Sequence, residues 1–129
     1  MSSENLVYKL ILPMKLHSLN EYIDACRRNH YAGAKMKRSD QHSVEWCIRS
    51  QLKGLKIKYP VRMAYRWYEP NRKRDLDNIS SYGRKVIQDA LVACRVLEDD
   101  SWKQVKGFTD YFDIDSKNPR IEVFLIKEK

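Results

Sequence analysis

Residues 61–94, VRMAYRWYEPNRKRDLDNISSYGRKVIQDALVAC, contain the pattern of a strand followed closely by the pattern of a helix. Over residues 61–68 apolar and polar side chains alternate, which indicates a β-strand, and Pro70 ends the pattern. Over residues 75–94 the apolar side chains recur at helical spacing, so they gather on one side of a helix. We therefore predict a strand, a short basic link and a helix.

The flanking sequence supplies the other elements. Residues 7–12 form an apolar run that predicts a first strand. Ser18 and Glu21 have the spacing of a capping box that opens a helix, and a second helix is expected over residues 34–52, with Gly33 as the interruption. Two strands over residues 105–114 and 120–126 flank a turn-forming segment, as in a hairpin.

These elements predict one α+β domain over residues 1–129, in the order β-α-α-β-α-β-β. A chain of this length suits a single core. The expected architecture is a mixed four-stranded sheet with helices packed on it.

Positive charge is concentrated in one part of the chain. The formal net charge is +8, and residues 26–74 hold fourteen Lys or Arg against three acids, a net charge of +11. A solvated surface kept for solubility is the ordinary explanation for isolated charges. For so one-sided a block, binding to nucleic acid is the favoured interpretation.

Several classes of protein are disfavoured. The three cysteines are far apart and contain no C-x-x-C pair, which argues against a disulfide framework or a zinc cluster. The N-terminal residues lack the pattern of a signal peptide, and no apolar run approaches the ~20 residues of a membrane span. We expect a cytoplasmic protein without membrane contact.

Three aspartates are candidates for metal chemistry. Asp75 and Asp77 follow a basic triplet at the predicted strand-to-helix junction, and Asp100 follows the helix. Magnesium prefers carboxylate oxygens and is often held by one or two carboxylates together with substrate phosphate. Side chains at i and i+2 of an extended segment point to the same side, so Asp75 and Asp77 are expected to converge on one ion, with Asp100 approaching from the following loop.

A structural role is the alternative for these aspartates. An aspartate at a helix start caps free N–H groups and complements the helix dipole, and Asp-x-Asp alone is common. The combination of three aspartates, a basic triplet and a basic preceding region favours the metal site, because clustered carboxylates repel unless a cation offsets them.

The chain also resembles a known family. The segments RKRDLDN (residues 72–78), DAL (residues 89–91) and LEDD (residues 97–100) are similar to those of the RusA family of Holliday-junction resolvases. The resemblance is specific over residues 60–126 and implies a RusA-like fold, a homodimer that binds four-way junction DNA, and metal-binding aspartates at Asp75, Asp77 and Asp100. It also implies an essential lysine on the intervening helix.

The position of that lysine departs from the family pattern. Counting forward from DLDN, the position of the family's lysine falls on Ser81. Counting backward from DAL, it falls on Lys85. The counts differ by four residues, about one helical turn. Lys85 is the chosen candidate, and Arg84, better aligned with Asp77, is held in reserve.

The expected reaction is hydrolysis of a phosphodiester by water, with Mg²⁺ as the ion, Mn²⁺ as a substitute and no small-molecule cofactor. The predicted catalytic residues are Asp75, Asp77, Lys85 and Asp100. The predicted DNA-contacting residues are Lys37, Arg38, Arg66, Arg72, Lys73, Arg74 and Arg84. A nonenzymatic basic DNA-binding module, or a metal nuclease for flaps or single strands, are the alternatives.

Overall fold

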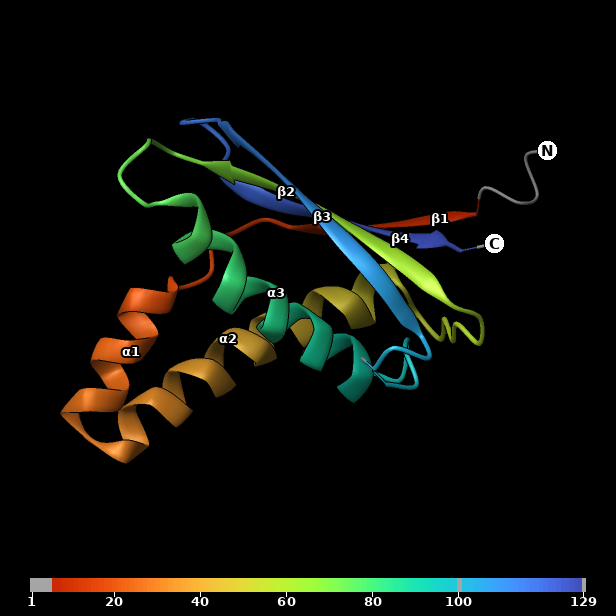
Figure 1. Ribbon diagram of the computed structural model, residues 1–129, viewed down its shortest axis with the longest axis horizontal. Coiled ribbons are helices and arrows are strands. Elements are labelled where there is room, and N and C mark those ends of the chain that lie inside the picture. The colour runs from red at the N-terminus through yellow and green to blue at the C-terminus, as the bar shows by residue number, and fades with distance from the viewer. Residues whose placement is uncertain (1–5, 100, 129) are drawn as a thin grey trace.

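A computed structural model describes residues 6–99 and 101–128. They form three helices and four strands in the predicted order β-α-α-β-α-β-β, which confirms a single α+β domain with a mixed sheet (Figure 1). The elements are β1 (Val7–Leu12), α1 (Leu19–Arg28), α2 (His30–Gln51), β2 (Val61–Glu69), α3 (Leu76–Ala93), β3 (Val105–Ile114) and β4 (Arg120–Lys127).

The sheet has the strand order β1-β4-β2-β3. β4 is antiparallel to both β1 and β2, whereas β3 lies parallel to β2. The unit β2-α3-β3 is therefore a crossover, because parallel neighbours need a long connection such as a helix. It brings the carboxyl ends of β2 and β3 to the same edge of the sheet, beside the start of α3.

The prediction that the last two strands form a hairpin is wrong. β3 and β4 are not neighbours, because β2 lies between them. Residues 115–119 instead carry the chain past the end of β2, and the Asp115 N–H donates to the Glu69 carbonyl at 2.8 Å. Neighbouring strands lie about 4.8 Å apart, so a five-residue link is long enough to pass over one strand.

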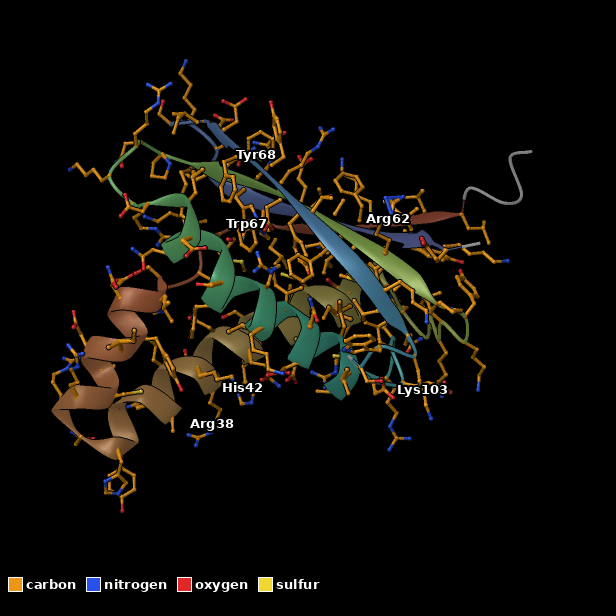
Figure 2. All side chains as sticks on the ribbon, viewed as in Figure 1. Arg38, His42, Arg62, Trp67, Tyr68 and Lys103 are labelled. Atoms are coloured by element: carbon orange, nitrogen blue, oxygen red, sulfur yellow. The ribbon has the colours of Figure 1, made fainter. Side chains whose placement is uncertain are left out.

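The three helices cover one face of the sheet, as Figure 1 shows. The alternation in β2 decides which face, since Met63, Tyr65 and Trp67 are buried beneath the helices while Arg62 and Arg66 lie on the opposite, open face. Figure 2 shows Trp67 between the sheet and the helices, and Arg62 on the far side. Tyr65 and Trp67 therefore belong to the core.

The break between the first two helices lies at Asn29, not at Gly33. The Asn29 side chain accepts hydrogen bonds from the N–H groups of Tyr31 and Ala32, and so caps α2. Gly33 instead lies within α2 against α1, where a Cβ atom would overlap the Cys26 sulfur. The predicted capping box of Ser18 at the start of α1 is confirmed by both of its hydrogen bonds.

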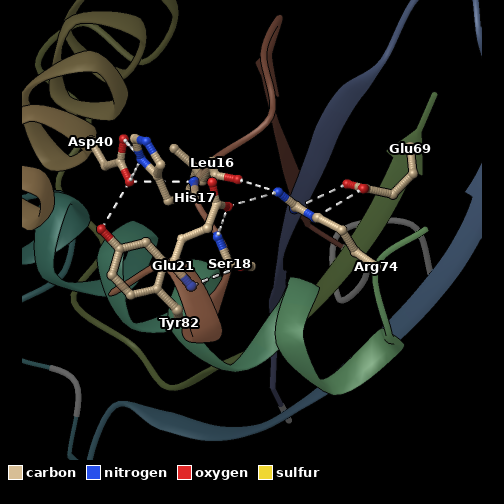
Figure 3. Close-up of polar contacts among 8 residues, drawn as sticks. All are labelled: Leu16, His17, Ser18, Glu21, Asp40, Glu69, Arg74 and Tyr82. Atoms are coloured by element: carbon tan, nitrogen blue, oxygen red, sulfur yellow. Dashed lines mark hydrogen bonds and ion pairs between the residues drawn. The ribbon is translucent and has the colours of Figure 1, made fainter. Parts of the chain in front are cut away.

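A buried carboxylate joins the helices and fixes the position of α3. Asp40 of α2 accepts a hydrogen bond of 2.8 Å from the Tyr82 hydroxyl of α3, and lies 2.9 Å from Nδ1 of His17, just before α1 (Figure 3). Burial, together with the contact to Asp40, raises the pKa of Tyr82. α3 is thus held by polar contacts as well as by its apolar side.

Gly83 allows α3 to approach the sheet closely, and Gly83→Ala is expected to destabilise the fold. The new Cβ atom would lie 2.8 Å from Trp67 Cζ3, so the buried indole or the helix must shift. We expect a loss of about 1–3 kcal/mol in the free energy of unfolding, measured by urea denaturation, although alanine is the better helix former. Gly107→Ala is the control, because its Cβ would meet no atom within 4 Å. Equal stability of Gly83→Ala and the wild type would contradict the packing argument.

Candidate active site

Asp75 and Asp77 lie at the start of α3, where the chain leaves the end of β2. Asp75 occupies the N-cap position with extended backbone dihedral angles, φ −69° and ψ 150°, but its side chain makes no capping hydrogen bond. Asp77 lies in the first turn, and both side chains are exposed. Among the described residues neither carboxylate has an ion-pair partner. Capping therefore does not account for Asp75.

A hollow of about 320 Å³ lies beside Asp75, and we call it the Asp75 hollow. The end of β2, the link to α3, the start of α3 and the end of β3 form its wall. Its lining includes Asp75, Leu76, Ile79, Phe112, Asp113 and Ile114. Asp113 was not predicted as a site residue, because only the parallel pairing of β3 with β2 brings it near Asp75.

The basic triplet separates into two exposed residues and one that points into the protein. Arg72 and Lys73 are exposed, and within the described ranges their charged groups have no acidic partner. Arg74 donates a hydrogen bond of 3.0 Å to the Leu16 carbonyl, and its Nε lies 3.2 Å from Oε1 of the buried Glu69 (Figure 3). The charge of Arg74 is therefore used within the fold.

Replacing Arg74 is expected to destabilise the protein. Arg74→Ala would leave the carboxylate of Glu69, 6% exposed, buried without its partner. We expect a loss of roughly 3 kcal/mol in the free energy of unfolding, measured by thermal or urea denaturation. Arg72→Ala is the matched control and should change stability by less than about 0.5 kcal/mol. Equal effects of the two substitutions would show that Arg74 has no structural role.

A second acidic segment lies at the other end of α3. The Asp99 carboxylate accepts hydrogen bonds from the N–H and hydroxyl of Ser101, and these hydrogen bonds lower the pKa of Asp99. Asp100, the predicted third metal ligand, lies outside the described residues. Because α3 has 18 residues at about 1.5 Å each, its ends are about 27 Å apart. Among the described residues no group of three His, Cys, Asp or Glu side chains could hold a metal ion.

Comparison with protein families identifies the chain. The model of the family described as endodeoxyribonuclease RusA matches residues 3–126 of the 129. The chain belongs to the RusA family. RusA proteins are endodeoxyribonucleases that resolve Holliday junctions, so the chain is a nuclease of that general kind. A search of curated proteins finds no significant match.

Three residues of α3 were candidates for the family's lysine. Ser81 is the nearest of them to Asp77 along the chain, and its hydroxyl donates a hydrogen bond of 2.7 Å to the Asp77 carbonyl. Lys85 forms an ion pair of 3.1 Å with Asp89, one turn further from Asp77. Arg84 points toward β3, where it donates to Asp110 and lies over the Phe108 ring. Within one RusA chain, Arg84 and Lys85 therefore each contact an acid that lies away from Asp77.

The remaining predicted DNA contacts lie on different faces of this RusA domain. Lys37 and Arg38 belong to α2, where Figure 2 shows Arg38 projecting away from the sheet. Arg66 lies on the open face of the sheet, with its guanidinium carbon 5.6 Å from the ring centres of Tyr111 and Phe124. Of these basic residues, only Arg72 and Lys73 combine exposure with a place beside Asp75. No helix in the described part of the chain is long and apolar enough to cross a membrane.

Proposed function

We propose that this protein cleaves four-way DNA junctions by magnesium-dependent hydrolysis, with Asp75 and Asp77 as metal ligands. One observation carries the assignment of these residues. Asp75 stands at the N-cap of α3 but does not cap it, and its carboxylate is exposed beside Asp77, Arg72 and Lys73. A carboxylate that caps a helix accepts hydrogen bonds from the N–H groups of its first turn.

The donor set at the start of α3 fits magnesium. Two carboxylates supply the hard oxygen ligands that this ion prefers, and phosphate and water complete such sites in phosphoryl-transfer enzymes. Mn²⁺ accepts the same ligands and is expected to substitute. When bound, the ion would polarise the phosphoryl oxygens and lower the pKa of coordinated water.

The residues of the chain bind and orient the scissile phosphate. Arg72 and Lys73, on the link that enters α3, are placed to contact the DNA backbone on either side of it. Lys85 is proposed to offset the negative charge that develops on the phosphate or its leaving oxygen, with Arg84 as the reserve. Water is the attacking group, so no covalent intermediate and no small-molecule cofactor are required.

The length of α3 supports a homodimer with shared active sites. Asp77 and the described neighbours of Asp100 lie at opposite ends of a helix about 27 Å long, so the two acidic segments do not meet within one chain. A two-fold dimer would bring Asp100 of a second copy to Asp75 and Asp77. It would also place two equivalent sites on a substrate whose cleavage positions are related by near two-fold symmetry.

Cleavage of defined DNA substrates tests the proposal. An end-labelled synthetic four-way junction is incubated with the protein alongside a linear duplex and a flap of matched length, with Mg²⁺, with Mn²⁺ and with chelator. We expect paired, symmetric nicks on the junction that require a divalent ion. Tight binding without cleavage under either metal would make the chain a DNA-binding module, and preferential cutting of the flap would change the substrate class.

A further inference from the structure

One face of the sheet is open, because the described helices cover only the other face (Figure 1). The alternation along β2 places Arg62, Ala64, Arg66 and Tyr68 on this open face, and Figure 2 shows Arg62 on the side away from the helices. The solvent-facing side of such a sheet commonly carries polar side chains. Here it also carries aromatic rings that lie beside basic side chains.

Four side chains of the open face form a diagonal row across all four strands. Tyr111 of β3 is paired in register with Arg66 of β2, and Phe124 of β4 is paired with Lys9 of β1. The Arg66 guanidinium carbon lies 5.6 Å from the ring centres of both Tyr111 and Phe124. Nζ of Lys9 lies 5.5 Å from the Phe124 ring centre. Rings and cations therefore alternate along this diagonal row.

The diagonal row carries positive charge that the fold does not use. Among the residues that the structure describes, no acid forms an ion pair with Arg66, which is exposed. The acid nearest in register, Glu122, is only 8% exposed and already lies 2.9 Å from Nε of Arg120 and 3.8 Å from Nζ of Lys9. The ring of Tyr111 is 54% exposed beside Arg66. The open face thus presents a free guanidinium next to an accessible aromatic ring.

These features fit a ligand that is both anionic and flat. A second copy of the chain, or any apolar protein surface, would bury the Arg66 charge without an acidic partner, which is unfavourable. Nucleic acid meets both needs, because its bases stack on aromatic rings and guanidinium planes while its phosphates attract cations. In a duplex the neighbouring bases already cover each base face. A stacking surface therefore selects a single strand, as do other four-stranded sheets that carry aromatic residues on an open face.

We propose that the open face binds single-stranded DNA, with bases stacked on Tyr111 and Arg66 and phosphates held near Lys9. DNA is the expected polymer because the chain belongs to a family of endodeoxyribonucleases. Asp75 and Asp77 lie at the start of α3, which packs on the opposite face of the sheet. Binding at the open face therefore needs no metal ion, and the proposal goes beyond the proposed function.

Removing the exposed ring tests the site. Binding of a fluorescein-labelled oligothymidylate of about 16 nucleotides is measured by fluorescence anisotropy in the presence of chelator. Tyr111→Leu should raise the dissociation constant about 5-fold or more, since stacking of one base contributes at least that factor. Trp46→Leu is the matched control, because it removes a ring that is 73% exposed on α2, and it should leave the dissociation constant unchanged. Circular dichroism checks that both variants fold. Equal binding by Tyr111→Leu and the wild type would overturn the proposal.

Substitutions of Arg66 separate stacking from general attraction between charges. Arg66→Gln should weaken binding of the same strand about 5-fold or more. Arg66→Lys keeps the charge but loses the planar group, so it should recover only part of the affinity. Arg28→Gln removes an exposed arginine from α1 as the control for net charge. Equal losses in Arg66→Gln and Arg28→Gln, or full affinity in Arg66→Lys, would contradict the site.

A photochemical cross-link locates the bound strand without changing the protein. The oligothymidylate is remade with iododeoxyuridine, irradiated in complex with the wild type, and the cross-linked peptides are identified by mass spectrometry. We expect cross-links to the rings of Tyr111 or Phe124, and cross-links confined to α1 and α2 would refute the placement. The strand annealed to its complement should bind more weakly than the free strand. Tighter binding of the duplex, with the same loss in Tyr111→Leu, would refute the choice of a single strand.

The outcome is separable from that of the proposed function. If Tyr111→Leu and Arg66→Gln weaken binding of the single strand while the wild type cuts no four-way junction, the site on the open face stands and the nuclease assignment fails. If the wild type cuts junctions while both variants bind the single strand as the wild type does, the nuclease assignment stands and this site fails.

Discussion

Asp77→Asn is expected to reduce the rate of junction cleavage on the order of 10³-fold while the protein remains folded and binds DNA. Asparagine keeps the shape of the side chain but lacks the charge that magnesium needs, and the bound ion contributes several kcal/mol to the stabilisation of the transition state. Asp77 is exposed in the first turn of α3, so its replacement should change the free energy of unfolding by less than about 0.5 kcal/mol. Single-turnover cleavage of a labelled four-way junction measures the rate.

Asp113→Asn is the matched control for this substitution. Asp113 lines the same hollow as Asp75, and its carboxylate accepts a hydrogen bond from the Ile114 N–H, a role that an asparagine oxygen also fills. We expect its cleavage rate to stay within a few-fold of the wild type. Full cleavage by Asp77→Asn would remove Asp77 from the metal site, and a large loss in Asp113→Asn would make Asp113 a further ligand.

Mixing two inactive variants is expected to restore cleavage. In Asp77→Asn dimers and in Asp100→Asn dimers both shared sites lack one ligand. A mixed dimer has one site lacking both ligands and one site that is intact. Random exchange of subunits makes half of the dimers mixed, so about a quarter of the wild-type sites return, from a background near zero. The assay is nicking of a four-way junction after the two proteins are mixed, denatured and refolded together.

The kind of product distinguishes shared sites from sites within one chain. A mixed dimer with one working site nicks the junction once, so nicked molecules accumulate and paired cuts stay rare. If all three aspartates acted within one chain, mixing would restore nothing, because every chain carries one substitution. Refolded Asp77→Asn alone and Asp100→Asn alone provide the baseline.

Local structure was largely predictable because short-range patterns determine it. The alternation in residues 61–68 correctly predicted a strand, which the structure places at Val61–Glu69. Helical spacing placed α3 within a residue or so of its observed ends, and the Ser18 capping box was found from two residues. Each of these features depends on neighbours in the sequence.

Contacts between distant segments were not predictable from the same patterns. A turn-forming segment between two strands predicts a hairpin, but whether a third strand lies between them depends on the whole sheet. Likewise the sequence did not indicate that Arg74 forms an ion pair with Glu69. Nor did it indicate that the Arg84 side chain turns toward Asp110. The aspartate motif could be located, but the position of Asp113 beside Asp75 depends on the parallel pairing of β3 with β2.

The position of β4 has a consequence for how the protein is made. β4 is the last of the seven elements to leave the ribosome, yet it lies between β1 and β2 and pairs with both. Until it emerges, the nascent chain has its first strand without a neighbour and an apolar gap in the sheet. We therefore expect the nascent chain to be prone to aggregation until β4 emerges, because such non-local pairing forms slowly and leaves unpaired edges exposed. Mutations that weaken β4 should lower the yield of protein in the cell before they lower the activity of the molecules that fold.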